Sequence, residues 1–243
     1  MGNRRQVVSA AAVLVAAAAA IFAVGIGLGL GLVGRHGGGL IQGWDGQVQT
    51  WDLHHRFGLV GASKVVAFLG DAPKLAVIAV GLTIILLIAI RTIRSLVPIV
   101  AYLGGELQVY LIRAIIHRHR PPTANFPAPG AVPGVHETSF SFPSGHSVAV
   151  TAVLFACLGV LALAYRWWWP WALAFLASLY VIYTRLNLGV HWFSDVTFGL
   201  VLGIAWGVTV AFVAYRVDWD DVRAWLPGRR RRPAPTREPA PDR

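Results

Sequence analysis

The residues best suited to chemistry lie in one short stretch, Thr184 to Asp195, which joins two apolar runs. It holds a guanidinium at Arg185, an imidazole at His191 and a carboxylate at Asp195. If the chain is helical from His191 onward, His191 and Asp195 stand four residues apart on one face. Asp195 could then fix the tautomer of the imidazole and leave its other nitrogen free as a nucleophile or base. The alternative is that Arg185 and His191 reach toward lipid headgroups while Asp195 caps a helix.

A second group of candidates is a set of arginines suited to holding a phosphate. Arg113 is followed, after six intervening residues, by Arg120 and Pro121. Together with Arg185, these two side chains offer planar forks of N–H donors that match the oxygens of a tetrahedral dianion. The segment from Arg113 to His146 is expected to be a loop, because five prolines lie between residues 121 and 133.

The third candidate is the tetrapeptide Pro143-Ser144-Gly145-His146, which directly precedes an apolar run. Ser144 is predicted to be the N-cap of a helix, with Gly145 just inside it. Free backbone N–H groups at such a helix start, together with the helix dipole, form an anion site. His146 lies beside that site, where an imidazolium could protonate a departing oxygen.

Composition places these candidates in a membrane protein. The chain has 243 residues, of which 56% are hydrophobic and only 13% charged, and its mean hydropathy is +0.61. In a soluble protein the net charge of +10 would suggest nucleic acid as a partner. Here much of that charge flanks apolar runs, which indicates membrane topology, and no nucleic-acid partner is expected. The single cysteine, Cys157, excludes an internal disulfide and a cysteine-based metal cage.

The apolar runs predict an all-α, polytopic membrane helix bundle with about six transmembrane helices and an interfacial helix. The expected spans cover residues 7–33, 73–90, 96–112, a run from after 146 to 165, a fifth run ending near 183, and 193–214. The first run is longer than the apolar region of a signal peptide, so an uncleaved helix is predicted. The chain is divided into a first transmembrane helix (1–33), an external interfacial segment (34–72), a helix bundle that carries the motifs (73–215) and a disordered, basic and proline-rich cytoplasmic tail (216–243).

Six spans place both termini on one side of the membrane. The arginines of that side flank the ends of the spans, and the positive-inside rule makes the side cytoplasmic. The opposite, external side also holds arginines: Arg35, Arg56, Arg113, Arg118, Arg120 and Arg185. Because these residues break the charge bias, we interpret them as the ligands of a bound anion. The sequence therefore predicts a multi-pass protein of the cell membrane, with both termini cytoplasmic and the three motifs on the external, periplasmic side.

With three motifs at one predicted face, the chain resembles the type 2 phosphatidic acid phosphatases, specifically the bacterial six-span membrane lipid phosphatases. The family pattern is Lys-x6-Arg-Pro, then Pro-Ser-Gly-His, then Ser-Arg-x5-His-x3-Asp, in this order. The matching positions are Arg120 and Pro121, Pro143 to His146, and Arg185, His191 and Asp195. Two positions depart from the pattern: Arg113 stands in place of the lysine and Thr184 in place of the first serine. The resemblance covers about residues 73–214.

The resemblance implies a metal-independent lipid phosphate phosphatase that needs no cofactor. It implies that His191 forms a phosphohistidine, that Asp195 orients its ring, and that His146 protonates the leaving group. The residues that it implies for phosphate binding are Arg113, Arg120, Ser144, Gly145 and Arg185. The expected substrate is a lipid phosphate, either undecaprenyl diphosphate, phosphatidylglycerophosphate or phosphatidate, with membrane lipids as the surroundings. The oligomeric state stays open.

Two other functions are compatible with parts of the pattern. A vanadate-dependent haloperoxidase is the nearest in chemistry, because vanadate could occupy the same arginines; six spans argue against it. A lipid transporter or flippase would place charges near the middle of the bilayer. Only Glu106 is a candidate for such a charge, and a carboxyl that hydrogen-bonds a neighbouring helix explains it at least as well.

Overall fold

The computed structural model describes residues 2–56, 58–90 and 92–216, and it is helical throughout except for loops and one isolated β-bridge. The α-helices are α1 (Gly2–Leu28), α2 (Gln42–His54), α3 (Val60–Gly70), α4 (Ala72–Ile90), α5 (Val97–Ile116), α6 (Gly145–Tyr165), α7 (Trp169–Asn187) and α8 (Phe193–Arg216). Short helical turns cover Gly29–Val33, Ile93–Leu96 and Pro122–Ala124. The all-α prediction is confirmed. The predicted disorder of the tail concerns residues outside the described part, apart from Arg216, which ends α8.

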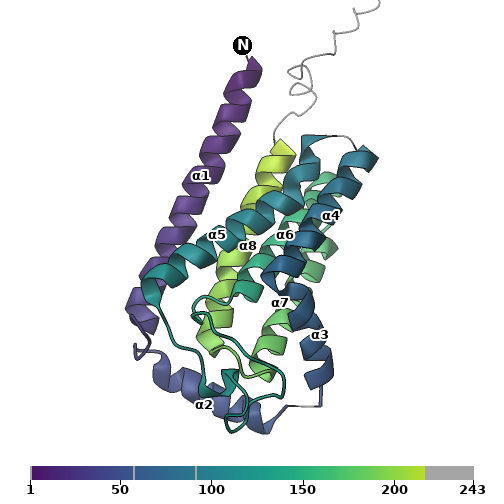
Figure 1. Ribbon diagram of the computed structural model, residues 1–243. Helices are drawn as coiled ribbons and strands as arrows, with labels where there is room; N and C mark the ends of the chain where they lie inside the picture. The colour runs from purple at the N-terminus through teal and green to yellow at the C-terminus, as the bar shows by residue number, and fades with distance from the viewer. Residues whose placement is uncertain (1, 57, 91, 217–243) are drawn as a thin grey trace, which may run out of the picture.

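Five of the described helices are long and apolar enough to cross a membrane. They are α1 with the turn that follows it (Val8–Val33), α4, α5 with the turn before it (Arg94–Ile116), α6 and α8. The remaining long helix, α7, runs beside α6 (Figure 1). Its mean hydropathy is lowered by tryptophans in its first turn and by Arg185 and Asn187 in its last. The described bundle thus has six long helices, five of them strongly apolar.

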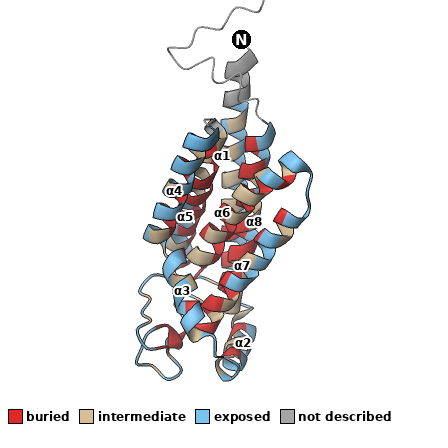
Figure 2. Ribbon diagram, turned by 90° about the vertical axis from the view of Figure 1, so that its right-hand side faces the viewer, coloured by how far each residue is buried: buried red, intermediate tan, exposed pale blue. Residues whose placement is uncertain are grey.

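The helices are arranged around a central pair, α6 and α8. Buried residues lie on the faces that α5, α6, α7 and α8 turn toward one another, whereas α1 and α4 are mostly exposed (Figure 2). The exposed side chains of the outer helices are apolar; Val15, Val77 and Ile88 are each 70% exposed or more. Such side chains are stable in contact with lipid tails rather than water.

The central pair packs closely because α8 presents small residues to α6. Gly199, Gly203 and Gly207 follow one another at intervals of four and lie on one helical face. A Cβ atom added at Gly203 would lie 2.7 Å from the backbone oxygen of Val148 and 2.8 Å from Cβ of Thr151. The backbones of α6 and α8 can therefore approach only where these glycines lie, as in other membrane helix pairs.

The polar groups lie at one end of this bundle. α1 begins and α8 ends at the opposite end (Figure 1). The segment predicted to be interfacial contains α2 and α3, and α2 has an inverted polarity. Its Trp44 and Trp51 are exposed, whereas Asp45 and Asp52 are buried against the bundle. An exposed aromatic face is the pattern expected of a helix at a membrane surface.

One helix boundary near the site differs from the prediction. α5 continues to Ile116, about one turn beyond the expected end, so Arg113 belongs to the last turn of a helix rather than to the loop. The helix stops at His117, which has a left-handed backbone (φ 53°). α8 begins at Phe193, where the sixth span was predicted to begin, so His191 lies just before the helix and not in its first turn.

The close approach of α6 and α8 predicts the effect of a single methyl group. Gly203→Ala should lower the free energy of unfolding by about 1–3 kcal/mol, because backbone atoms of α6 must shift to admit it. The matched control is Gly81→Ala on α4, where an added Cβ meets nothing within 4 Å. Thermal unfolding of both variants in detergent micelles measures the difference. Equal midpoints for the two variants would contradict the packing described here.

Candidate active site

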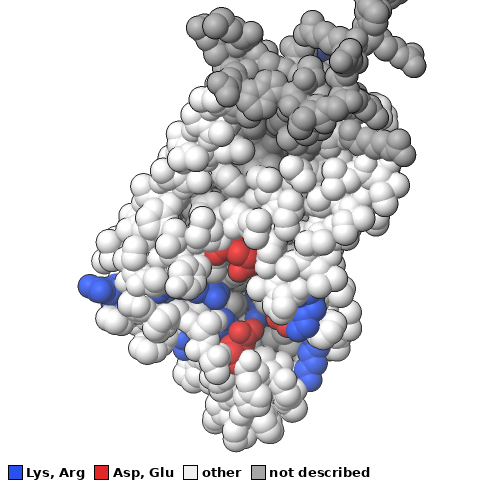
Figure 3. Space-filling model, turned by 45° about the horizontal axis from the view of Figure 1, so that its top comes forward, with Lys and Arg blue, Asp and Glu red and all other residues white. Residues whose placement is uncertain are grey.

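The eight residues selected from the sequence meet at the end of the bundle that carries α2 and α3. They come from the last turn of α5, the loop after it, the start of α6, the end of α7 and the start of α8. Charged side chains gather there around a hollow in an otherwise largely uncharged surface (Figure 3). Direct contacts join them in pairs, including Arg120 with His191, Arg185 with His146, and the backbone N–H of Ser144 with the backbone oxygen of Asp195.

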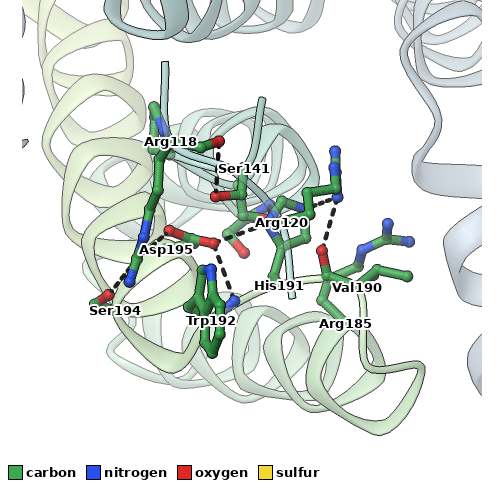
Figure 4. A network of polar contacts seen from close by, with 12 residues as sticks. Arg118, Arg120, Ser141, Arg185, Val190, His191, Trp192, Ser194 and Asp195 are labelled. Atoms are coloured by element: carbon green, nitrogen blue, oxygen red, sulfur yellow. Dashed lines mark hydrogen bonds and ion pairs between the residues drawn. The ribbon is translucent and has the colours of Figure 1, made fainter. Parts of the chain in front are cut away.

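His191 is held in one tautomer by its two neighbours. Although it precedes α8, its Nδ1 lies 3.4 Å from Oδ2 of Asp195. Its Nε2 lies 3.0 Å from Nη1 of Arg120. A guanidinium only donates hydrogen bonds, so Nε2 must be the acceptor and the hydrogen of the neutral ring must be on Nδ1, facing Asp195. The lone pair of Nε2 is therefore directed toward the arginines (Figure 4).

The surroundings of His191 also keep it uncharged. The residue is 2% exposed, and burial lowers its pKa. The positive charges of Arg120 and Arg185 lower it further, so the pKa of His191 lies well below its ordinary value. At neutral pH the imidazole is consequently neutral, which is the form in which Nε2 can act as a nucleophile.

Asp195 is fixed by contacts on both carboxylate oxygens. It is the third residue of α8, and its Oδ2 accepts a hydrogen bond from the backbone N–H of Trp192 (3.0 Å). This is the position from which a carboxylate caps a helix start. Its Oδ1 accepts from Nη1 of Arg118 at 2.6 Å (Figure 4). The carboxylate that faces His191 therefore has little freedom to rotate.

Arg118 has a different role from the one expected of an external arginine. It is 1% exposed, and its Nη2 donates to Oδ2 of Asp45 (2.6 Å) and Oε1 of Gln42 (2.9 Å). Two carboxylates, from Asp45 and Asp195, thus occupy this guanidinium, and the interpretation of Arg118 as an anion ligand was wrong. The sequence analysis did not select Asp45. The chain has only 11 acidic residues, and an acidic residue in the same external segments as the arginines is a natural ion-pair partner for one of them.

Arg120 and Arg185 are bridged by a carboxylate that the sequence analysis did not select. Glu137 Oε1 accepts from Nη2 of Arg185 at 2.5 Å, and Oε2 lies 3.2 Å from Nη2 of Arg120. Burial alone would raise the pKa of Glu137, but the two arginines outweigh it and hold the pKa below its ordinary value. Burial lowers the pKa of Arg120 to about 10, which still leaves it charged at neutral pH. The ionised Glu137 therefore occupies donors of the kind that a phosphate would use.

The start of α6 lies against Arg113. The Ser144 Oγ accepts from the backbone N–H of Ser147 (3.4 Å), which makes Ser144 the N-cap that the sequence predicts. Arg113 donates from Nη2 to the backbone oxygen of Pro143 (3.0 Å) and from Nη1 to Ser139 Oγ (3.3 Å). Because Arg113 replaces the lysine of the family pattern, its fork provides a second donor, and the two hydrogen bonds connect α5 with the loop.

His146 presents the opposite tautomer from His191. Its Nε2 lies 2.8 Å from the backbone oxygen of Ala67, an acceptor, so this nitrogen carries a hydrogen. Nη1 of Arg185, 3.4 Å from the same nitrogen, is therefore a neighbouring donor and not a hydrogen-bond partner. Asp71 Oδ1 lies 3.5 Å from the same nitrogen. A Cβ at Gly70 would lie 2.6 Å from the His146 ring, so only glycine allows this approach. Sequence reasoning did not select Asp71, whose only signal was its place just before the second span.

The remaining chemistry of the site is that of an arginine cluster with two histidines. Arg185 Nε is a buried donor that has no hydrogen-bond acceptor among the described atoms. Within the described residues, no three His, Cys, Asp or Glu side chains come together as a set of metal ligands. The arrangement can hold an anion against Nε2 of His191, and the imidazolium form of His146 can supply a proton from Nε2.

The bridging carboxylate predicts how the site responds to an anion. Glu137→Gln should tighten the binding of orthovanadate roughly tenfold or more, because a hydrogen bond between charged groups is worth about 1.5–3 kcal/mol. Calorimetric titration of the purified protein at neutral pH measures the affinity. Asp52→Asn, which removes a carboxylate beside Arg56, is the matched control and should leave the affinity unchanged. Unchanged or weaker binding by Glu137→Gln would show that its carboxylate does not compete for the arginines.

Known proteins share both the sequence and the shape of this region. The chain is 28% identical over 120 residues to an undecaprenyl-diphosphatase from Sulfolobus acidocaldarius, an alignment that covers 49% of this chain and 51% of the relative. The chain thus matches about half the length of this curated relative. The crystal structure of the first transmembrane PAP2 type phosphatidylglycerolphosphate phosphatase from Bacillus subtilis has a similar fold, with a TM-score of 0.61 and 24% identity over 85% of this chain and 92% of that one.

A family model also matches the chain. The model described as the PAP2 superfamily matches residues 94–219, which is more than half of the chain. The matched region contains all three motifs, from Arg113 to Asp195. The protein therefore belongs to the PAP2 superfamily.

Proposed function

We propose that this protein is an integral membrane lipid phosphate phosphatase that works through a phosphohistidine. The observation that carries the proposal is the position of His191. Its unprotonated Nε2 points into the arginine cluster, while Nδ1 faces the buried Asp195. A neutral imidazole beside fixed positive charge is suited to attack an electrophile that carries negative charge.

In the first step, His191 Nε2 attacks phosphorus and a P–N bond forms as the bond to the lipid oxygen breaks. The imidazole gains positive charge, which the Asp195 carboxylate stabilises through Nδ1–H. Arg120 and Arg185 bind the phosphate oxygens and stabilise their charge in the transition state, once Glu137 releases them. The arginines supply the positive charge that a metal supplies in other phosphatases, so the reaction should need no metal.

The two remaining proton transfers fall to His146. In its imidazolium form it gives the proton of Nε2 to the departing lipid oxygen and becomes neutral, while Asp71 and the Ala67 carbonyl help to hold the ring in place. Water then attacks phosphorus, the P–N bond breaks, and the proton of the water returns to His146. Phosphate is released, and His191 returns to its neutral starting form.

The substrate class follows from the place of the site at the end of an apolar bundle. A phosphate carried by a lipid would reach the arginines from the membrane surface, with its tail along the helices. We propose undecaprenyl diphosphate as the first candidate, followed by phosphatidylglycerophosphate and phosphatidate. Two relatives support this choice, because their names refer to the first two of these lipids.

Phosphate release from these three lipids tests the proposal directly. The purified protein should release phosphate from at least one of them in excess EDTA. His191→Ala should abolish turnover, and His146→Ala should lower kcat by about 10²–10⁴-fold, the range typical of general acid catalysis. The control is His54→Ala, an exposed histidine of α2, which should keep full activity. Loss of activity with EDTA and its return with magnesium would refute the metal-independent mechanism.

The proposed orientation places the site on the external side of the cell membrane, by the distribution of arginines. In a Cys157→Ser background, a cysteine introduced at Ala128 should react with a membrane-impermeant reagent in intact cells, because this loop lies at the site end. Trp168→Cys in the turn between α6 and α7 lies at the opposite end and should react only after lysis. The reverse pattern would place the site in the cytoplasm.

A further inference from the structure

A buried chain of charges connects α2 with the proposed catalytic carboxylate. Arg118 donates to Asp45 on one side and to Asp195 on the other, both at 2.6 Å. All three side chains are at most 1% exposed. An ion pair so fully removed from water is held by short contacts of good geometry, and it interacts more strongly than a surface pair.

The same chain fixes the first turn of α8. Asp45 Oδ1 accepts from the backbone N–H of Ser194 (2.9 Å), and Oδ2 accepts from its hydroxyl (2.5 Å). Arg118 Nη1 also donates to the Ser194 hydroxyl (2.8 Å; Figure 4). Asp45 lies outside the region that the family model matches, so α2 adds a contact to the site that residues 94–219 do not contain.

The charges in this chain do not cancel. Two carboxylates share one guanidinium, which leaves one negative charge uncompensated. Asp195, one of the two carboxylates, lies beside His191. The other charged or titratable groups that act on His191 are Arg113 on α5, Arg120 in the loop, His146 on α6 and Arg185 on α7. Those facing Asp195 are Arg118 and Asp45. Removal of the charge of Arg118 or of Asp45 must change the electrostatic potential at His191, and the two removals must act in opposite directions.

We propose that Arg118 and Asp45 are positioning residues that hold Asp195 against His191 and set the charge that His191 experiences. The inference rests on the proposed role of His191 as nucleophile. Without Arg118, the excess negative charge favours proton uptake by His191 or Asp195. In either case, activity begins to fall at a higher pH than in the wild type. Without the Asp45 charge, Arg118 compensates Asp195 more fully, and proton uptake requires a lower pH.

The test is the pH profile of kcat/KM for undecaprenyl diphosphate, measured with the full-length protein in detergent micelles. In Arg118→Gln, the pH below which activity falls should rise, by on the order of one unit for a buried unit charge at this range. In Asp45→Asn it should fall by a similar amount. The double variant, which removes both charges, should return close to the wild-type profile and recover part of the kcat lost in Arg118→Gln.

Two further variants separate this role from a purely structural one. Lys64→Gln is the matched control, because Lys64 is an exposed cation of α3 at the same end of the bundle, and its profile should equal that of the wild type. Arg118→Lys keeps the charge but not the fork, so it should lower kcat while leaving the pH profile nearly unchanged. If Arg118 and Asp45 served only to hold the fold together, their variants would yield less folded protein. The pH profiles of Arg118→Gln and Asp45→Asn would then not shift in opposite directions.

Parallel or absent shifts in Arg118→Gln and Asp45→Asn would overturn the inference while leaving the proposed function intact, provided that the wild type is active. If Arg118→Gln does not fold, Asp45→Asn decides alone: a shift to lower pH supports the inference and an unchanged profile refutes it. Absence of wild-type turnover on all three lipids would refute the proposed function, and this inference with it.

Discussion

Buried guanidinium groups at the end of a membrane bundle need acceptors, because an unpaired charge in such a place is costly. Arg118 finds two of them in Asp45 and Asp195, and Arg185 finds one in Glu137. The polar loop and α2 fold over the bundle end in the arrangement that provides these carboxylates. The geometry of the site thus depends on how its arginines are compensated, more than on the apolar packing below it.

The carboxylates do not balance the arginine charges equally across the site. Because of this difference, the two histidines have different neighbours and carry their ring hydrogens on different nitrogens. His191 lies among arginines and next to Asp195, so its Nε2 accepts a hydrogen bond and its pKa is low. His146 lies against a backbone oxygen and Asp71, so its Nε2 carries a hydrogen. One imidazole is thereby prepared to attack, and the other directs an N–H that it can donate in its imidazolium form.

The sequence predicted the helical class, the start of α6 at Ser144 and the eight residues that meet at the site. It could do so because apolar length and motif spacing are local properties. The partners Asp45, Asp71 and Glu137 could not be assigned in this way, since their contacts join segments far apart in the chain. The contact of His191 with Asp195 does not need a helix from His191 onward, because Asp195 caps α8 and contacts the histidine before it in the same geometry. The packing face at Gly203 was not selected from the sequence, because the helix that it contacts lies far away in the chain.

The central claim is that His191 Nε2 bonds to phosphorus during turnover. The most direct measurement is a rapid quench at alkaline pH, where phosphohistidine is stable, followed by mass spectrometry of peptides from the full-length protein mixed with undecaprenyl diphosphate. The account predicts a transient phosphate on His191, retained longer in His146→Ala, whose hydrolysis step is slowed. A phosphate on His146 instead, or turnover by His191→Ala with the modification elsewhere, would contradict the account.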